Sequence, residues 1–311
     1  MNAVVTGSIA YDYLMSFPGK FTEQLVEGHL QRVSLSFLVD TMDKRRGGCA
    51  PNIAYTLALL GEKPRLMGTA GQDFEEYRRW LEAAAVDTSL VAIVPNKFTA
   101  SFFCSTDEDN NQIASFYTGA MAHAAELSFR SAGKVDLAII SPNDPAAMTQ
   151  YADECRTLGI KFIFDPGQQC ARMSGDELAS GLAGALILIC NDYELELIRQ
   201  KTGKGEAEIL AECEMLVVTK GEHGCTIMRK GSQVDVPAVT PSRIADPTGV
   251  GDAFRGGFMK GLAAGATDEV CGRLGSVAAT YCLEHLGGTS HNYTWKAFVQ
   301  RYEMHFGKLS L

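Results

Sequence analysis

The sequence predicts an α/β fold, a mostly parallel sheet flanked by helices on both faces, with a small antiparallel β lid. Short apolar runs alternate with longer segments of helical spacing, which is typical of a parallel sheet covered on both sides. Two other segments alternate apolar and polar residues, the pattern of antiparallel strands. The 311 residues suffice for about one large α/β domain with a small attachment.

Strands and helices are predicted from separate sets of segments. Uninterrupted apolar runs suit strands buried on both faces, and they span residues 3–6, 65–68, 135–141, 161–164, 185–190 and 215–219. Helical spacing predicts helices over residues 51–60, 74–85, 146–158 and 253–264. The first and last of these stop before Gly61 and Gly265, and glycine is favoured just past a helix end.

The alternating segments, residues 31–40 and 98–118, predict the antiparallel lid. The turn signal Asp-Glu-Asp-Asn-Asn at residues 107–111 makes the second segment a hairpin. A hairpin centred on Asp109 sets Phe102 opposite Phe116, and such cross-strand aromatic pairs stabilise ribbons. We therefore expect a lid that closes over the carboxyl ends of the parallel strands, where α/β sheets bind ligands. The expected large domain is 1–14, 44–96 and 119–311, and the expected lid is 15–43 and 97–118.

Composition argues against several functional classes. The 28 Lys and Arg against 37 Asp and Glu give a net charge of −9, which disfavours nucleic acid or an anionic membrane as partner. The longest apolar candidate, residues 182–190, is less than half of the ~20 residues that a membrane helix needs. Nine cysteines without a CxxC pair predict reduced thiols in a cytoplasmic protein. The six histidines are too dispersed to predict a metal site.

The strongest motif is Asp-Pro-Thr-Gly-Val-Gly-Asp-Ala-Phe-Arg-Gly-Gly-Phe at residues 246–258. Its glycines permit a ligand to approach the backbone, and a helix is expected from about Asp252, so several amides converge at a site for phosphate. There Asp252 could accept a proton from an attacking hydroxyl, and the helix dipole favours its ionised form. The alternative is that Asp252 only stabilises the helix. No Gly-Lys-Ser/Thr follows, and the motif matches neither Walker A nor the dinucleotide-binding GxGxxG.

A second motif, Arg-Gly-Gly-Cys-Ala-Pro-Asn at residues 46–52, opens a helix. Gly47 and Gly48 allow a ligand near the backbone, and Pro51 suits a first helical turn. Asn52 lies about one turn into the helix, with an amide that both donates and accepts hydrogen bonds. Taken alone, a Gly-Gly pair at the start of a helix is more often a simple turn than a ligand site.

Together these motifs resemble the ribokinase-type (PfkB) carbohydrate kinase family, in that family's order and over essentially the whole chain. Other matching segments are Gly7-Ser8-Ile9-Ala10-Tyr11-Asp12, Asn191-Asp192-Tyr193-Glu194 and Thr219-Lys220-Gly221-Glu222-His223-Gly224. Within the family the chain is most similar to the bacterial adenosine kinases, through residues 5–10, 33–40, 112–117, 119–121 and 165–169.

The resemblance implies phosphoryl transfer from ATP-Mg²⁺ to the 5′-hydroxyl of adenosine, which gives AMP and belongs to purine salvage. It implies Asp252 as general base and the amides of Gly249, Val250 and Gly251 as an anion hole, although the family usually has a small residue at position 250. Glu194 would organise Mg²⁺, largely through water. The residues implied to contact ATP are Asn191, Thr219, Gly221, Thr248, Gly249 and Gly251.

The same resemblance implies a nucleoside site in which Asp12, helped by Gly48 and Asn52, binds ribose hydroxyls. A flat base needs apolar faces and a few hydrogen-bonding groups. Phe102 and Phe116 suit the faces, although ribbon packing or a subunit contact would also explain the pair. The remaining residues implied to line the site are Ser8, Ser36, Met121, Gln168 and Gln169.

Alternatives stay open at this point. One is a sugar kinase of the ribokinase or fructokinase type, or another nucleoside kinase of the same family. Another is a non-catalytic nucleoside-binding module, which the intact Asp252 and its glycines disfavour. The apolar face formed by Leu35, Phe37 and Val39 would allow a homodimer through the lid.

Overall fold

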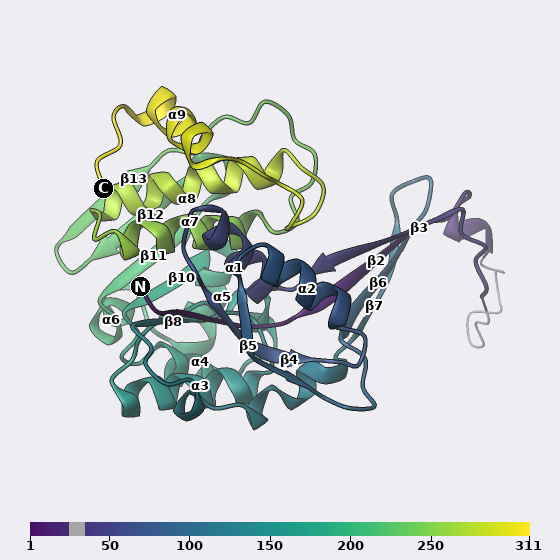
Figure 1. Cartoon of the computed structure of the whole chain (residues 1–311), viewed down its shortest axis with the longest axis horizontal. Coiled ribbons are helices and arrows are strands. Elements are labelled where there is room, and N and C mark those ends of the chain that lie inside the picture. Colours follow the sequence, from purple (N-terminus) through teal and green to yellow (C-terminus); the bar gives the residue numbers. More distant parts are fainter. Residues whose placement is uncertain (25–34) are drawn as a thin grey trace.

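The computed structural model describes residues 1–24 and 35–311 (Figure 1). Within them the main sheet has nine strands in the order β13-β12-β11-β10-β9-β8-β1-β4-β5. Strands β11 to β5 of that order run parallel, and β12 and β13 continue the sheet antiparallel at one edge. The bounds are β1 Ala3–Thr6, β4 Arg65–Ala70, β5 Asp87–Ile93, β8 Leu137–Ile140, β9 Lys161–Phe164, β10 Ile187–Asn191, β11 Met215–Thr219, β12 Cys225–Arg229 and β13 Ser232–Val236.

Helices cover both faces of this sheet, so the predicted fold class is confirmed. The α-helices are α1 Cys49–Leu59, α2 Glu75–Ala83, α3 Pro145–Leu158, α4 Gly175–Leu182, α5 Asp192–Thr202, α6 Glu206–Glu212, α7 Val250–Ala263, α8 Asp268–Leu283 and α9 Trp295–Phe306. Shorter 3₁₀ helices are η1 Phe21–Gln24, η2 Gly119–Glu126, η3 Phe129–Ser131, η4 Gly167–Ala171 and η5 Gly221–His223. None of the described helices combines the length and the apolarity needed to span a membrane.

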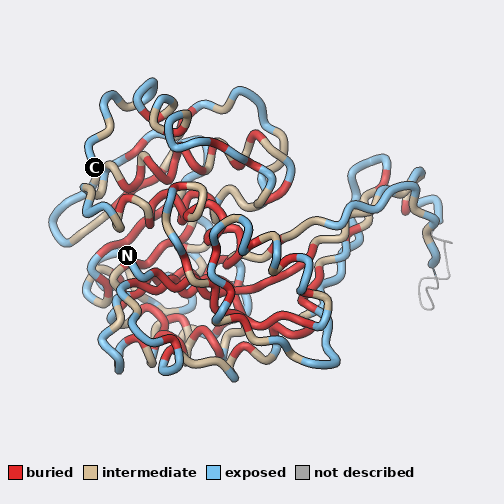
Figure 2. The backbone as a smooth tube through the Cα atoms, viewed as in Figure 1, coloured by how far each residue is buried: buried red, intermediate tan, exposed pale blue. Residues whose placement is uncertain are grey.

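Alternation along the buried strands divides the core into two layers. Val5 and Ile139 pack in one cluster with residues of α1, α2 and α7. Their neighbours Val4 and Ile140 pack in the other cluster with residues of α3, α4, α5 and α6. Because successive side chains of a strand point to opposite faces, uninterrupted apolar runs are what such a double-sided core requires. Figure 2 shows these buried strands at the centre of the body.

A second, four-stranded sheet projects from the body at the right of Figure 1 and forms the lid. Its strand order is β3-β2-β6-β7, with bounds β2 Ala10–Ser16, β3 Thr41–Gly47, β6 Ala100–Thr106 and β7 Gln112–Tyr117. Strands β6 and β7 form the predicted hairpin, and Phe102 lies opposite Phe116 as expected. The predicted domain limits at residues 14 and 43 cut through β2 and β3.

One predicted lid strand is wrong. Of residues 31–40, the first four lie outside the described residues, and residues 35–40 form no strand. The strand is instead Thr41–Gly47, which carries the charged run Asp43, Lys44, Arg45 and Arg46 and has no apolar alternation. An apolar residue of this segment packs locally instead: the ring of Phe37 contacts the rings of Phe17 and Phe21.

Candidate active site

A cavity of about 660 Å³ lies where the carboxyl ends of the parallel strands meet the lid. Residues at or just after the carboxyl ends of β1, β8, β9, β10 and β11 line it, which is where open α/β sheets place their ligands. Most of the predicted site residues meet here: Ser8, Asp12, Gly48, Asn52, Phe102, Phe116, Met121, Gln168, Gln169, Asn191, Glu194, Thr219, Thr248, Gly249, Gly251 and Asp252. Three predicted residues, Ser36, Val250 and Gly221, do not line it, and Ser36 and Gly221 are exposed.

Helix α7 brings the anion-binding turn into the cavity. It begins at Val250, two residues before the predicted start, with Gly249 as its N-cap in a left-handed conformation at φ 77°. A Cβ at Gly249 would lie 2.5 Å from the Cα of Gly288, so the turn has room only for glycine. The amide of Val250 donates to the carbonyl of Pro247 at 3.3 Å, which leaves the amides of Gly249, Gly251 and Asp252 as the stronger candidates to meet an anion.

Asp252 occupies the first turn of α7 and lines the cavity. Its Oδ2 accepts a hydrogen bond from Nδ2 of Asn52 at 2.8 Å, across 200 residues of sequence. Burial raises the pKa of Asp252 to about 7, although the Asn52 hydrogen bond and the charge of Arg255 act in the opposite direction. The expectation that the helix dipole keeps it fully ionised is therefore incomplete, because desolvation outweighs the dipole at this depth. A carboxyl that titrates near neutrality is suited to accept a proton.

The predicted ribose-binding residues come from the lid and from helix α1. Asn52 is only 4% exposed, and its Oδ1 has no hydrogen-bond partner in the structure. Asp12 lies on β2, beside Arg45 on β3 in the strand register, and burial raises its pKa to about 6. Because a buried unpaired acceptor is costly, Asn52 is arranged to receive a donor from a ligand such as a hydroxyl.

An aromatic and amide surface faces the lid side of the cavity. Phe102 and Phe116 present their rings from neighbouring strands, and Met121 of η2 adds a buried apolar wall. Gln169 of η4 is 6% exposed, and its Oε1 is buried without a partner. The neighbouring Gln168 is exposed, with its Nε2 3.8 Å from Sγ of Cys49. This surface suits a flat ring with polar edges.

Several of the residues predicted to contact ATP lie where helices begin. Asn191 caps α5, and a reciprocal pair of bonds joins it to Glu194: the amide of Glu194 donates to Asn191 Oδ1 at 2.7 Å, and the amide of Asn191 donates to Glu194 Oε2 at 2.8 Å. The Asn-x-x-Glu pattern thus has a structural role as a capping box. Burial raises the pKa of Glu194. In the described residues no three His, Cys, Asp or Glu side chains gather as a metal site.

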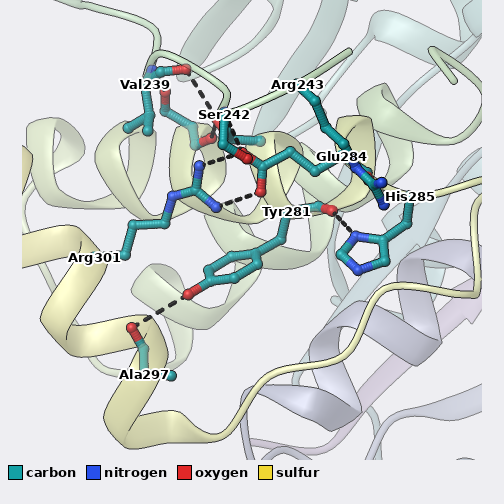
Figure 3. Close-up of polar contacts among 10 residues, drawn as sticks. Val239, Ser242, Arg243, Tyr281, Glu284, His285, Ala297 and Arg301 are labelled. Atoms are coloured by element: carbon teal, nitrogen blue, oxygen red, sulfur yellow. Dashed lines mark hydrogen bonds and ion pairs between the residues drawn. The ribbon is translucent and has the colours of Figure 1, made fainter. Parts of the chain in front are cut away.

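A polar network secures the segment that leads into the motif (Figure 3). Glu284, at the end of α8, accepts two hydrogen bonds of 2.7 Å from Arg301 of α9 and one from the amide of Ser242. The side chain of Arg243 donates to the carbonyl of Glu284 at 2.8 Å. Because these bonds join two helices to one loop, the chain enters residues 246–252 from a fixed direction.

Sequence reasoning assigned no role to a buried ion pair in the cavity wall. Arg255, one turn after Asp252, pairs with Asp165 at the end of β9. Both residues stood inside segments that carried the family resemblance, but no local pattern connects positions 90 residues apart. Only the fold reveals the contact.

Comparison with known proteins agrees with this geometry. The pfkB family carbohydrate kinase model matches residues 8–295. The structure of Burkholderia thailandensis nucleoside kinase in complex with inosine is 39% identical, with a TM-score of 0.87 over 98% of each chain. The structure of Methanocaldococcus jannaschii nucleoside kinase is 27% identical, with a TM-score of 0.88 over 98% of this chain and 99% of that one. A nucleoside kinase of Methanothermobacter thermautotrophicus is 30% identical over 98% of this chain and 96% of its own length. The chain therefore belongs to the PfkB family of carbohydrate kinases.

Proposed function

We propose that this protein transfers the γ-phosphoryl group of ATP to the 5′-hydroxyl of a purine nucleoside, with adenosine as acceptor and AMP as product. The observation that carries the proposal is that one cavity joins Asp252 and the start of α7 to a surface suited to a flat base. Its volume of about 660 Å³ lies within the usual range of small-molecule sites. The similarity to nucleoside kinases, one of them bound to inosine, supports the acceptor class.

Each part of the nucleoside has a counterpart in the cavity. The base would lie against Phe102 and Phe116, with its polar edge at the unpaired Oε1 of Gln169. The ribose hydroxyls would bind Asp12 and Asn52, so that the 5′-hydroxyl is directed towards Asp252. That arrangement would bring the attacking oxygen and its proton acceptor together before the reaction, and such positioning is one of the two main contributions that a phosphoryl-transfer site makes.

The chemical step then uses groups that are already in place. Asp252 takes the proton of the 5′-hydroxyl as that oxygen attacks the γ-phosphorus, and the bond to the β-phosphate oxygen breaks to release ADP. The amides of Gly249, Gly251 and Asp252 would stabilise the charge on the transferred group. Asn191, Thr219 and Thr248 would contact the donor nucleotide.

Magnesium fits this site through Glu194. A Mg²⁺ ion that accompanies a nucleotide typically takes only one or two carboxylates, because phosphates and waters complete its octahedron. Glu194 lines the cavity and is held in position by the amide of Asn191. The ion would supply neutralisation of the phosphate charge when bound.

Inosine is a second candidate acceptor, because a relative that is 39% identical has been solved with it. The amide of Gln169 offers an acceptor to the 6-amino group of adenine and, rotated, a donor to the 6-oxo group of hypoxanthine. We therefore expect both purine nucleosides to bind.

A substrate panel tests the proposal. ATP and Mg²⁺ are incubated with adenosine, inosine, guanosine, cytidine, ribose or fructose, and the products are identified by mass spectrometry. We expect AMP from adenosine and a weaker signal from inosine. Phosphorylation of ribose or fructose in preference to every nucleoside would contradict the proposed acceptor class, and bound adenosine without turnover would identify a non-catalytic binding module.

We further propose that the lid mediates a homodimer. Met42 and Ile113 are 61% and 46% exposed and lie on the face of the small sheet opposite to Phe102. Light scattering after size exclusion should show a dimer, and Ile113→Lys should shift it towards monomer. Met304→Lys on α9, where the apolar side chain is 80% exposed and lies away from the lid, serves as control. A monomeric native protein would contradict this proposal.

A further inference from the structure

The ion pair of Arg255 and Asp165 is the most deeply buried one that lines the cavity. Arg255 is 7% exposed and Asp165 is 1% exposed. Arg255 Nε lies 2.5 Å from Asp165 Oδ2, and Nη2 lies 2.6 Å from Oδ1, so the contact is bidentate. It ties the end of the central strand β9 to the first turns of α7.

A third bond connects the same guanidinium to the anion-binding turn. Nη1 of Arg255 donates to the carbonyl oxygen of Gly251 at 3.0 Å. That carbonyl belongs to the peptide group whose N–H is the amide of Asp252. A positive charge on the carbonyl side polarises the peptide and strengthens its N–H as a donor. A Cβ at Gly251 would lie 3.0 Å from Nη1, so glycine leaves space for this approach.

Stability alone is a poor reason for such a pair. Taking two charges out of water costs free energy, and well-packed apolar residues of similar volume are often at least as stabilising. What an apolar pair lacks is a fixed orientation and a positive charge. Both matter in a cavity that also holds the carboxyl groups of Glu194 and Asp252 and that would receive a triphosphate.

We propose that Arg255, held by Asp165, is a positioning residue for phosphoryl transfer: it fixes and polarises the peptide at the start of α7 that faces the transferred group. The inference rests on the proposed kinase reaction, but not on the identity of the acceptor. It concerns the γ-phosphoryl group, so the same loss is expected with whichever acceptor the wild-type protein uses.

The test compares three variants with the wild type: Arg255→Lys, the neutral double variant Asp165→Asn with Arg255→Gln, and Arg229→Gln as control. Arg229 forms a second bidentate pair, with Asp268 at 2.6 and 3.1 Å, between β12 and α8 and outside the cavity lining. The double variant leaves no lone buried charge, so its fold is expected to persist. The readouts are kcat, the KM for each substrate, nucleoside affinity by calorimetry, and the melting temperature.

We expect the double variant to lose on the order of 10²-fold in kcat while nucleoside affinity stays within about 3-fold, since misplaced reacting groups cost about that much. Arg255→Lys should lose less of kcat than the double variant, because lysine keeps the positive charge but cannot form the bidentate contact with Asp165. Arg229→Gln should lower the melting temperature and leave kcat unchanged. The proposal is overturned if the double variant keeps kcat within about 3-fold, or if kcat and nucleoside affinity fall together. If the double variant does not fold, a Lys variant with wild-type kcat overturns it equally.

Discussion

At the scale of single residues, the protonation of Asp252 is the central variable. Burial raises its pKa from 3.8 in the unfolded chain to about 7. A base works only when deprotonated, so the rate should rise with pH up to about 7 and then level off. The expected measurement is kcat/KM between pH 5.5 and 9, and a profile that is flat across neutrality would contradict this role.

Replacing Asp252 by Asn should separate catalysis from stability. We expect kcat to fall by roughly 10²–10⁴-fold, the usual contribution of a positioned base, with nucleoside affinity retained. Because the pKa is raised from 3.8 in the unfolded chain to about 7 in the folded protein, the free energy of unfolding of the wild type falls as pH rises between these two values. The variant lacks this loss, so its melting temperature should exceed that of the wild type at alkaline pH. Equal melting temperatures there would show that the carboxyl is not strained by burial.

The aromatic pair supplies a second prediction at this scale. Phe102→Ala should raise the KM for the nucleoside by about 10-fold or more, since base stacking on an aromatic ring contributes about 1–3 kcal/mol, while the KM for ATP changes little. Phe103→Ala is the matched control, because its ring stacks on Tyr13 at 4.8 Å on the opposite face of the lid. Equal increases for both substrates in Phe102→Ala would indicate general destabilisation instead.

Residues in contiguous motifs were the ones that the sequence could predict. Asp252 and Asn52 stand in short glycine-rich patterns, and both line the cavity. The pairing of Arg255 with Asp165 depends on where β9 ends relative to α7, which no local pattern encodes. Ser36 was placed in the nucleoside site by resemblance alone, and the structure shows it exposed outside the cavity lining.

At the scale of elements, the two ends of α7 provide a controlled comparison. Gly249→Ala forces a side chain into φ 77° and against the Cα of Gly288, so it should destabilise the fold and lower kcat by at least about 10²-fold. Gly265→Ala, just past the other end, has φ 68° and no atom within 4 Å of its Cβ. It should cost only the ~1–2 kcal/mol of left-handed backbone strain, with kcat unchanged. Similar kcat values for both variants would contradict the special role of the N-terminal turn.

Strands buried on both faces were predictable from their apolar runs, and the more exposed hairpin of β6 and β7 was predictable from its turn signal, but the exposed strand β3 was not. Strand β3 carries Asp43, Lys44 and Arg45, so its sequence predicts a solvent-exposed segment and not a strand. It is nevertheless a strand, because β2 supplies its hydrogen-bonding partner along the full length. Pairing of this kind comes from the neighbouring strand and leaves little trace in the residues themselves.

At the scale of the whole molecule, His291 links the loop after α8 to helix α1. It is fully buried, and its Nε2 lies 3.2 Å from the hydroxyl oxygen of Thr56. Burial lowers its pKa from 6.5 to about 4. A lowered folded-state pKa means that its stabilisation is complete above pH 6.5 and is lost as pH falls towards 4.

This loss is best measured as a difference, because the buried Asp12 and Asp252 respond to pH in the opposite sense. The free energy of unfolding of the wild type, minus that of His291→Gln, should fall between pH 6.5 and 4 in urea titrations. A difference that does not change with pH would show that His291 is protonated equally in both states.

The path of the chain between the two sheets has a mechanical consequence. Strand β1 of the body ends at Thr6, and β2 of the lid begins at Ala10, so Ser8 lies in the short crossing between them. On the way back, β3 ends at Gly47 and α1 starts at Cys49, which leaves Gly48 in the return crossing. A bound nucleoside would therefore touch the pivot of the lid as well as its sheet. Any rotation of the lid would move Phe102 and Phe116 further than Ser8 and Gly48. The contacts to the sugar would then persist while the contacts to the base form or break.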